Sequence, residues 1–97
     1  MFNLNEYMRD NRQENGNVKR INCADGFTIS VQGSNGTYCD PRKDLADHYY
    51  EVECGFPNAT PEYIMDYAEN RDDPTETVYG YVPIALVEQL IDLHGGV

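Results

Sequence analysis

The chain has 97 residues and a formal net charge of −10 at pH 7, from 17 acidic residues against 7 lysines and arginines. This length suits one domain with a small core, and a hydrophobic content of 40% separates the chain from a disordered acidic tail. Because phosphates would repel so many carboxylates, the charge argues against direct binding to nucleic acid or to an anionic membrane. No apolar run is long enough to cross a bilayer and no signal peptide is evident, so we expect a cytoplasmic protein.

The first expected element is a short amphipathic helix from Asn3 to about Arg12. Asn3 can cap this helix, and Glu6 stands three residues further on, as in a capping box. The apolar residues at helical spacing, which would face the core, are Leu4, Tyr7 and Met8.

Beyond the polar loop that follows, the period of the pattern changes from helical to alternating. Residues 18–23 predict a short strand, and residues 24–26 a tight hairpin turn. Residues 27–32 form the clearest half-buried strand, because apolar and polar side chains alternate without a break. After a second turn at residues 33–36, residues 37–39 are expected to begin a return strand.

Most of the charge lies in residues 40–76, where eleven acidic residues oppose three basic ones, a net charge of −8. Residues 49–54 predict a strand. One face of it would carry Tyr50, Val52 and Cys54, and the other Tyr49, Glu51 and Glu53. Residues 60–70 predict a helix, because Thr60 is a good N-cap and Pro61 suits the first helical position. The outward stripe of that helix would consist of Glu62, Asp66 and Glu69.

Two further elements are expected in residues 77–97. In the strand 77–82, Val78, Gly80 and Val82 alternate with Tyr79 and Tyr81, and Pro83 then starts a helix that Gly95-Gly96 caps. The broad apolar side of this helix would consist of Ile84, Leu86, Val87, Leu90, Ile91 and Leu93. Together the elements predict a single α+β domain over residues 1–97, with a small antiparallel sheet of about four strands and two or three helices packed on it.

Rows of carboxylates on a rigid scaffold are what a protein needs in order to imitate a nucleic acid. Residues on one face of a strand lie about 6.6–6.8 Å apart, and a helix stripe would add a second row about one turn apart. Arginine binds a carboxylate in the same bidentate manner as a phosphate. The candidate partner-binding residues are therefore Asp47, Tyr49, Glu51, Glu53, Glu62, Asp66, Glu69, Asp72 and Asp73. The alternative is that these carboxylates form only a solvated, solubilising surface.

Other kinds of chemistry match the sequence less well. A zinc site of Cys39, His48 and Cys54, with or without Cys23, lacks the paired spacing of such sites. The aspartates of residues 40–47 and 66–73 do not match a calcium-binding loop, and no spacing ties a cysteine to a histidine as nucleophile and base. We therefore expect no enzymatic activity, no metal and no cofactor, and we expect the three cysteines to be free thiols.

Five strings of residues carry a resemblance. They are DGFTISVQ at residues 25–32, YCDPR at 38–42, VECGFP at 52–57, TVYGYVP at 77–83 and LHGG at 93–96. Through them, the chain from about residue 20 onward resembles a family of small acidic proteins encoded by bacteriophages and prophages of proteobacteria. That family brings no catalytic motif, so the resemblance implies a setting, the infected bacterial cell, rather than an activity.

The resemblance and the acidic surface together predict a phage-encoded inhibitor of the anti-CRISPR type, by analogy with anti-CRISPR proteins that imitate DNA. As a monomer or homodimer in the host cytoplasm, it would block the basic nucleic-acid-binding site of a host defence complex, without binding nucleic acid or membrane itself. The alternative is a phage structural or accessory protein that oligomerises or docks on another phage component. In that case Tyr79, Tyr81 and the N-terminal helix would matter, and the acidic face would tolerate change.

Overall fold

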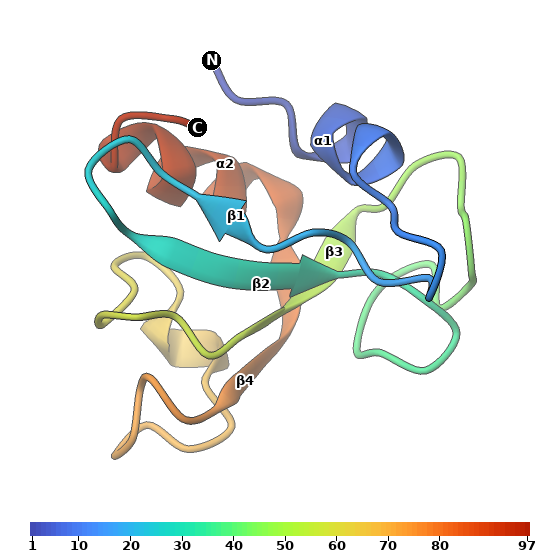
Figure 1. Ribbon diagram of the computed structural model, residues 1–97. Coiled ribbons are helices and arrows are strands. Elements are labelled where there is room, and N and C mark those ends of the chain that lie inside the picture. Colours follow the sequence, from blue (N-terminus) through green and yellow to red (C-terminus); the bar gives the residue numbers. More distant parts are fainter.

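The computed structural model describes residues 1–97 and consists of two α-helices, one 3-10 turn and four strands (Figure 1). The α-helices are α1 (Leu4–Asp10) and α2 (Ile84–Leu93), and the 3-10 turn η1 covers Met65–Tyr67. The strands are β1 (Ile21–Asn22), β2 (Thr28–Gln32), β3 (Glu51–Gly55) and β4 (Val78–Pro83). The predicted α+β class is confirmed.

The four strands form one antiparallel sheet in the order β1-β2-β3-β4. Each strand therefore pairs with the next one along the chain, with Ile21 opposite Ile29 and Val31 opposite Cys54. The turn expected at residues 24–26 closes the first hairpin, where the amide of Cys23 donates to the carbonyl of Phe27 at 2.8 Å. β1 is shorter than the strand expected over residues 18–23, and Val18 makes only an isolated bridge with Arg12.

One face of the sheet holds the core. Alternate residues of β2 and β3 are buried there, in a cluster of 19 hydrophobic residues that the two helices complete. The helices contribute Leu4, Met8, Val87, Leu90 and Ile91. The residues between the buried ones point to the opposite, outer face of the sheet, which neither helix covers.

A β-bulge interrupts the pairing of β3 with β4. Val52 lies opposite Val82 but Cys54 lies opposite Tyr79, so β4 has one residue more than β3 over this interval. The bulge is accommodated at Tyr81, whose φ is positive, at 53°. Tyr79 and Val82 are therefore both fully buried, and the strict alternation predicted for residues 77–82 is wrong at this point.

The helix predicted over residues 60–70 is wrong, because this segment contains only η1. Tyr63 has a positive φ of 73°, which a right-handed helix cannot accommodate. Ala68 then pairs with Tyr79, and the amide of Glu69 donates to the carbonyl of Val78 at 2.9 Å. The backbone of this segment thus forms hydrogen bonds with the edge of β4 instead of forming helical hydrogen bonds within itself.

The return strand expected at residues 37–39 does not form either. The chain instead reaches the sheet through a bridge between Asp40 and Glu51 and through Tyr38, whose carbonyl accepts from the amide of Tyr81 at 2.9 Å and whose amide donates to Oε1 of Glu53 at 3.2 Å. The sheet consequently gains no fifth strand.

The predicted caps at the start of α1 and at the end of α2 are confirmed, although α1 ends at Asp10 and not at about Arg12. Asn3 caps α1 by accepting a hydrogen bond from the amide of Glu6 at 3.0 Å. Gly95 and Gly96 end α2 with φ values of 90° and 75°, as expected for a C-terminal glycine cap. Neither helix is long and apolar enough to cross a membrane. In Figure 1 both ends of the chain lie on the same side of the sheet, near α1 and α2.

Candidate partner-binding surface

The outer face of β3 carries two of the predicted carboxylates. Glu51 and Glu53 alternate with the fully buried Val52 and Cys54, so they point away from the core and are half-buried. The prediction that these two glutamates share one face is therefore confirmed. Glu53 is also held in place, because its Oε1 accepts a hydrogen bond from the amide of Tyr38 at 3.2 Å.

Two tyrosines lie beside these glutamates on the outer face. The rings of Tyr38 and Tyr81 have their centroids 5.9 Å apart, and each residue is 44% exposed. Gly80 allows this approach, because a Cβ atom at Gly80 would come within 3.2 Å of the Cβ of Tyr38. The guanidinium carbon of Arg42 lies 5.5 Å from the centroid of the Tyr38 ring. We call Tyr38, Tyr81, Glu51 and Glu53 the tyrosine face.

The hydroxyl groups divide the eight tyrosines into two classes. Those of Tyr7, Tyr49 and Tyr79 are hydrogen-bonded to backbone carbonyls within the protein. The other five, on Tyr38, Tyr50, Tyr63, Tyr67 and Tyr81, have no hydrogen-bond partner in the protein. The two tyrosines of the tyrosine face can therefore offer both ring and hydroxyl to a partner.

A strongly acidic segment, residues 65–76, precedes β4 in the chain and pairs with its edge through Ala68 and Glu69; we call it the acidic loop. It contains five carboxylates and one basic side chain, that of Arg71, so the loop carries a net charge of −4. Arg71 reaches Asp66 at 3.5 Å, but both side chains are well exposed and such a pair is weak. Glu69, Asp72 and Asp73 are exposed and have no cationic partner. In Figure 1 the loop extends from the lower left of the sheet.

Glu62 belongs to a different cluster from the one predicted. Its Oε1 lies 3.3 Å from Nε2 of His94, while Nδ1 of His94 lies 2.7 Å from Oδ2 of Asp25. The ring of His94 also stacks on that of Phe27, at 4.1 Å between centroids and 11° between planes. The carboxylate of Glu62 is therefore engaged with the end of α2, away from Asp66 and Glu69.

The His94 cluster shifts two pKa values. Burial by itself lowers the pKa of His94, but the hydrogen bonds to Asp25 and Glu62 and the charges of these carboxylates outweigh it, so the pKa is raised above 6.5. The hydrogen bond from the amide of Phe27, followed by that from His94, lowers the pKa of Asp25. Both shifts favour the ion-paired form.

Besides Glu62, two more of the predicted residues lie outside any common acidic face. Tyr49 is only 2% exposed, so the expectation that it would stand beside Glu51 and Glu53 is wrong. β3 begins only at Glu51, and the alternation does not extend back to Tyr49, which turns inward while Tyr50 is 64% exposed. Asp47 is exposed but lines a small hollow against α1. Segment 40–50 and the acidic loop lie on opposite sides of the sheet in Figure 1.

Few of the carboxylates are neutralised within the protein. The only ion pairs are that of Arg71 with Asp66 and the two that His94 makes with Asp25 and Glu62. Some other acids accept backbone hydrogen bonds, as Glu88 does from Leu4 and Asp92 from Phe2, but these contacts leave the negative charge in place. The net charge of −10 is therefore available to act on a partner.

Comparison with protein-family models, with curated proteins and with solved structures gave no match. The assignment of a function therefore depends on the geometry of the site and on the sequence pattern.

Neither tyrosine of the tyrosine face was among the predicted partner-binding residues, because Tyr81 was assigned to the alternative function and Tyr38 was missed. The segment of Tyr38 is irregular, so no strand pattern marks it. The available signal was Gly80, because a glycine within a strand often marks a bulge or a close backbone approach, and here it marks both.

The geometry offers little for metal or thiol chemistry. No three histidine, cysteine, aspartate or glutamate side chains lie close enough together to hold a metal ion. Cys23, Cys39 and Cys54 are buried free thiols. Burial raises the pKa of Cys54 strongly and, with the charge of Asp25, also raises that of Cys23, which disfavours the reactive thiolate.

Proposed function

We propose that the protein is a non-catalytic inhibitor that binds, through the acidic loop and the tyrosine face, to a basic nucleic-acid-binding surface of another protein. The observation that carries the proposal is the set of exposed carboxylates without cationic partners at the β3–β4 side of the sheet. Glu69, Asp72 and Asp73 are its exposed members, and the half-buried Glu51 and Glu53 add two carboxylates on the outer face of β3.

The two parts of the surface have different roles. The carboxylates attract the partner over a distance and pair with its arginines and lysines, as phosphates would. Tyr38 and Tyr81 supply the contact area, since tyrosines at the centre of an interface often account for much of its binding energy. Strand β3 holds both glutamates, β4 holds Tyr81, and hydrogen bonds with Glu53 and Tyr81 hold the backbone of Tyr38, so little backbone ordering is needed on association.

Inhibition then follows from competition. A protein that occupies the cationic groups of a nucleic-acid channel excludes the nucleic acid without catalysing a reaction. The resemblance to small phage proteins supports a host defence complex as the target, in the manner of anti-CRISPR proteins. The resemblance and the surface overlap, because the strings that carry the resemblance include Tyr38, Glu53 and Tyr81, whereas the carboxylates of the acidic loop lie outside those strings.

A capture experiment tests the proposal. The tagged protein is incubated with bacterial lysate at about 0.15 M salt, and the captured proteins are identified by mass spectrometry. We expect a nucleic-acid-binding complex to be captured, and to be lost with the triple variant Glu69→Gln/Asp72→Asn/Asp73→Asn. The control is Glu14→Gln/Asp47→Asn, which removes two exposed charges that accept no hydrogen bond in the protein and lie away from the acidic loop.

Two results would overturn the proposal. If the triple variant captured the complex as well as the unaltered chain did, the acidic loop would be only a solubilising surface. If the protein captured only further copies of itself or components of a phage particle, the structural or accessory function would replace inhibition.

A further inference from the structure

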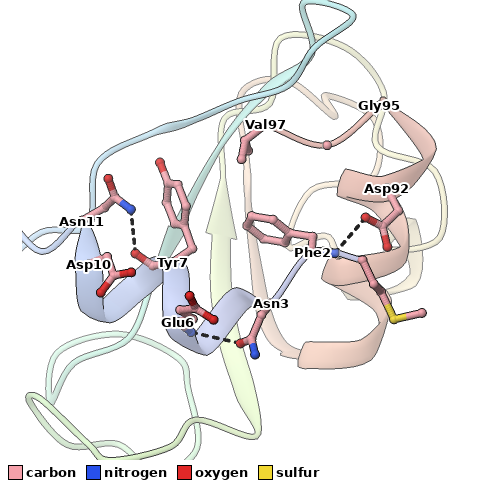
Figure 2. Close-up of a pocket in the computed structure, with 11 residues that line it drawn as sticks. Phe2, Asn3, Glu6, Tyr7, Asp10, Asn11, Asp92, Gly95 and Val97 are labelled. Carbon is pink, nitrogen blue, oxygen red and sulfur yellow. Dashed lines mark hydrogen bonds between the residues drawn. The ribbon is translucent and has the colours of Figure 1, made fainter.

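A hollow separate from the one beside Asp47 lies where α1 meets the end of α2, away from the tyrosine face and the acidic loop (Figure 2). It is an open cavity of about 640 Å³. The residues that matter for its chemistry are Phe2, Glu6, Tyr7, Asp10 and Asp92. None of them belongs to the tyrosine face or to the acidic loop.

Two aromatic rings form the middle of this cavity. Phe2 and Tyr7 have their ring centroids 5.6 Å apart, and Figure 2 shows both rings between α1 and the C-terminal segment. The hydroxyl of Tyr7 lies 3.1 Å from the carbonyl of Lys19, and the amide of Phe2 donates to Oδ1 of Asp92 at 3.0 Å. The ring of Tyr7 is thus held through its hydroxyl, and the backbone of Phe2 is held through its amide.

Carboxylates surround the rings. In the view of Figure 2, Asp10 and Asp92 stand on either side of the two rings, and Glu6 stands below them. The side chains of Glu6 and Asp10 accept no hydrogen bond within the protein, and no lysine, arginine or histidine side chain lines the cavity. The charge of the cavity is therefore uncompensated by any side chain, and its aromatic faces are partly exposed.

We propose that this cavity is a second binding site, for a basic peptide segment of a partner protein. A lysine or arginine side chain would lie over the rings of Phe2 and Tyr7, held by cation–π attraction, and would pair with the carboxylates around them. An anion would be repelled, and a purely apolar group would leave the carboxylates unpaired. The hollow is open to solvent, and its volume of about 640 Å³ leaves room for more than one side chain of a peptide lying across it.

The test uses a defined probe and needs no knowledge of the natural partner. The probe is the peptide acetyl-Gly-Arg-Leu-Arg-Gly-amide, and its control is the same peptide with both arginines replaced by citrulline, which is neutral and of nearly the same shape. Binding to the full chain is followed by NMR titration of the backbone amides. We expect shifts confined to residues 2–11 and 92–97, with the arginine peptide only.

Two matched double variants locate the binding. Glu6→Gln/Asp10→Asn should weaken peptide binding about tenfold, equivalent to about 1.4 kcal/mol. Glu14→Gln/Asp47→Asn removes the same number of charges elsewhere and should change the affinity less than about twofold, as expected of distant exposed charges. Phe2→Leu should weaken binding by about threefold or more through the lost ring. Circular dichroism verifies that each variant is folded.

Three outcomes would overturn this inference: equal binding of the citrulline peptide, equal weakening by both double variants, or shifts that map to the acidic loop. The first denies recognition of the cation, and the others deny a site at this cavity. The triple variant of the acidic loop should bind the peptide normally, so this site and the proposed inhibition can fail separately.

Discussion

The hydroxyl of Tyr49 connects backbone segments that no strand joins. Its oxygen lies 2.6 Å from the carbonyl of Lys43 and 3.1 Å from that of Gly33, and it accepts a hydrogen bond from the amide of Ala46. Asn5, which is buried in α1, holds the backbone of Tyr49 from the other side through two hydrogen bonds of 2.8 and 3.0 Å. This one residue thus fixes segment 33–49 to the helix and to the end of β2.

Replacing Tyr49 should therefore affect stability and not the binding surface. We expect Tyr49→Phe to lower the free energy of unfolding by about 1–3 kcal/mol, because buried polar groups lose their partner. Tyr50→Phe is the matched control, since the neighbouring hydroxyl is exposed and makes no hydrogen bond, and it should change stability by less than about 0.5 kcal/mol. Urea denaturation measures both. Equal effects of the two variants would contradict the assigned role.

His94 links three segments that are distant in the sequence. Its side chain is 15% exposed and lies between Asp25 of the β1–β2 turn and Glu62 of the segment that precedes η1. A neutral imidazole has a single N–H and can donate to only one of these carboxylates, whereas the protonated ring can donate to both. The cluster is therefore complete only when His94 carries its proton.

This arrangement predicts how stability changes with pH. The pKa of His94 is raised above its ordinary 6.5, so its contribution is fully present below about pH 6.5 and is lost as the pH rises through the raised value. The pKa of Asp25 is lowered from 3.8, so its contribution is present above about pH 3.8 and is lost as the pH falls through the lowered value. The stability difference between the unaltered chain and His94→Gln should be greatest between these limits. Urea denaturation from pH 4 to pH 9 measures it, and a difference that stayed constant over this range would rule out the protonated cluster.

At the scale of elements, local patterns predicted the helices, whose hydrogen bonds lie within the element, and the strand whose side chains alternate between a buried and an outer face. β2, α1 and α2 were recognisable for this reason, as were the cap at Asn3 and the glycines that end α2. Residues 60–70 carried the start signals of a helix, but residues 68 and 69 form backbone hydrogen bonds with the edge of β4 instead of helical ones. The bulge at Tyr81 was not predictable from alternation, because it inserts one residue and reverses the faces on either side.

The end of α2 separates two leucines that the sequence pattern grouped together. Leu90 is fully buried, whereas Leu93 is 50% exposed. Leu90→Ala should therefore lower the free energy of unfolding by about 2–5 kcal/mol through the lost contacts and the cavity left behind. Leu93→Ala should lower it by much less, about 0.5 kcal/mol. Thermal and urea denaturation compare the two, and similar losses would show that the helix is packed differently.

The bulge in β4 should matter more for binding than for stability. Tyr81 holds a bulky side chain at a positive φ of 53°, a conformation that glycine adopts without strain. We expect Tyr81→Gly to leave the free energy of unfolding within about 1 kcal/mol of the original, since strain is relieved while an exposed ring is lost. The same variant should reduce capture of the partner complex. Unchanged capture would remove the tyrosine face from the binding surface, and a large loss of stability would contradict the strain assigned to Tyr81.

For the whole molecule, the sequence predicted the amount of charge better than its arrangement. Glu51 and Glu53 could be placed on one face, because the period of a strand is fixed by backbone geometry. The partners of Glu62 and the inward turn of Tyr49 depend on contacts between segments far apart in the chain, which no local pattern reports. The acidic surface is consequently a loop and a strand beside two tyrosines, and not two parallel rows of carboxylates.

The central claim is that this surface occupies the place of a nucleic acid. The most direct test is a competition: the captured partner complex is challenged with an excess of a single-stranded or double-stranded oligonucleotide, with an uncharged polymer of similar size as control. We predict that the oligonucleotide releases the complex and that the uncharged polymer does not, because both ligands need the same arginines and lysines. If the complex stayed bound at saturating oligonucleotide, the protein would bind elsewhere on its partner and the claim of mimicry would be wrong.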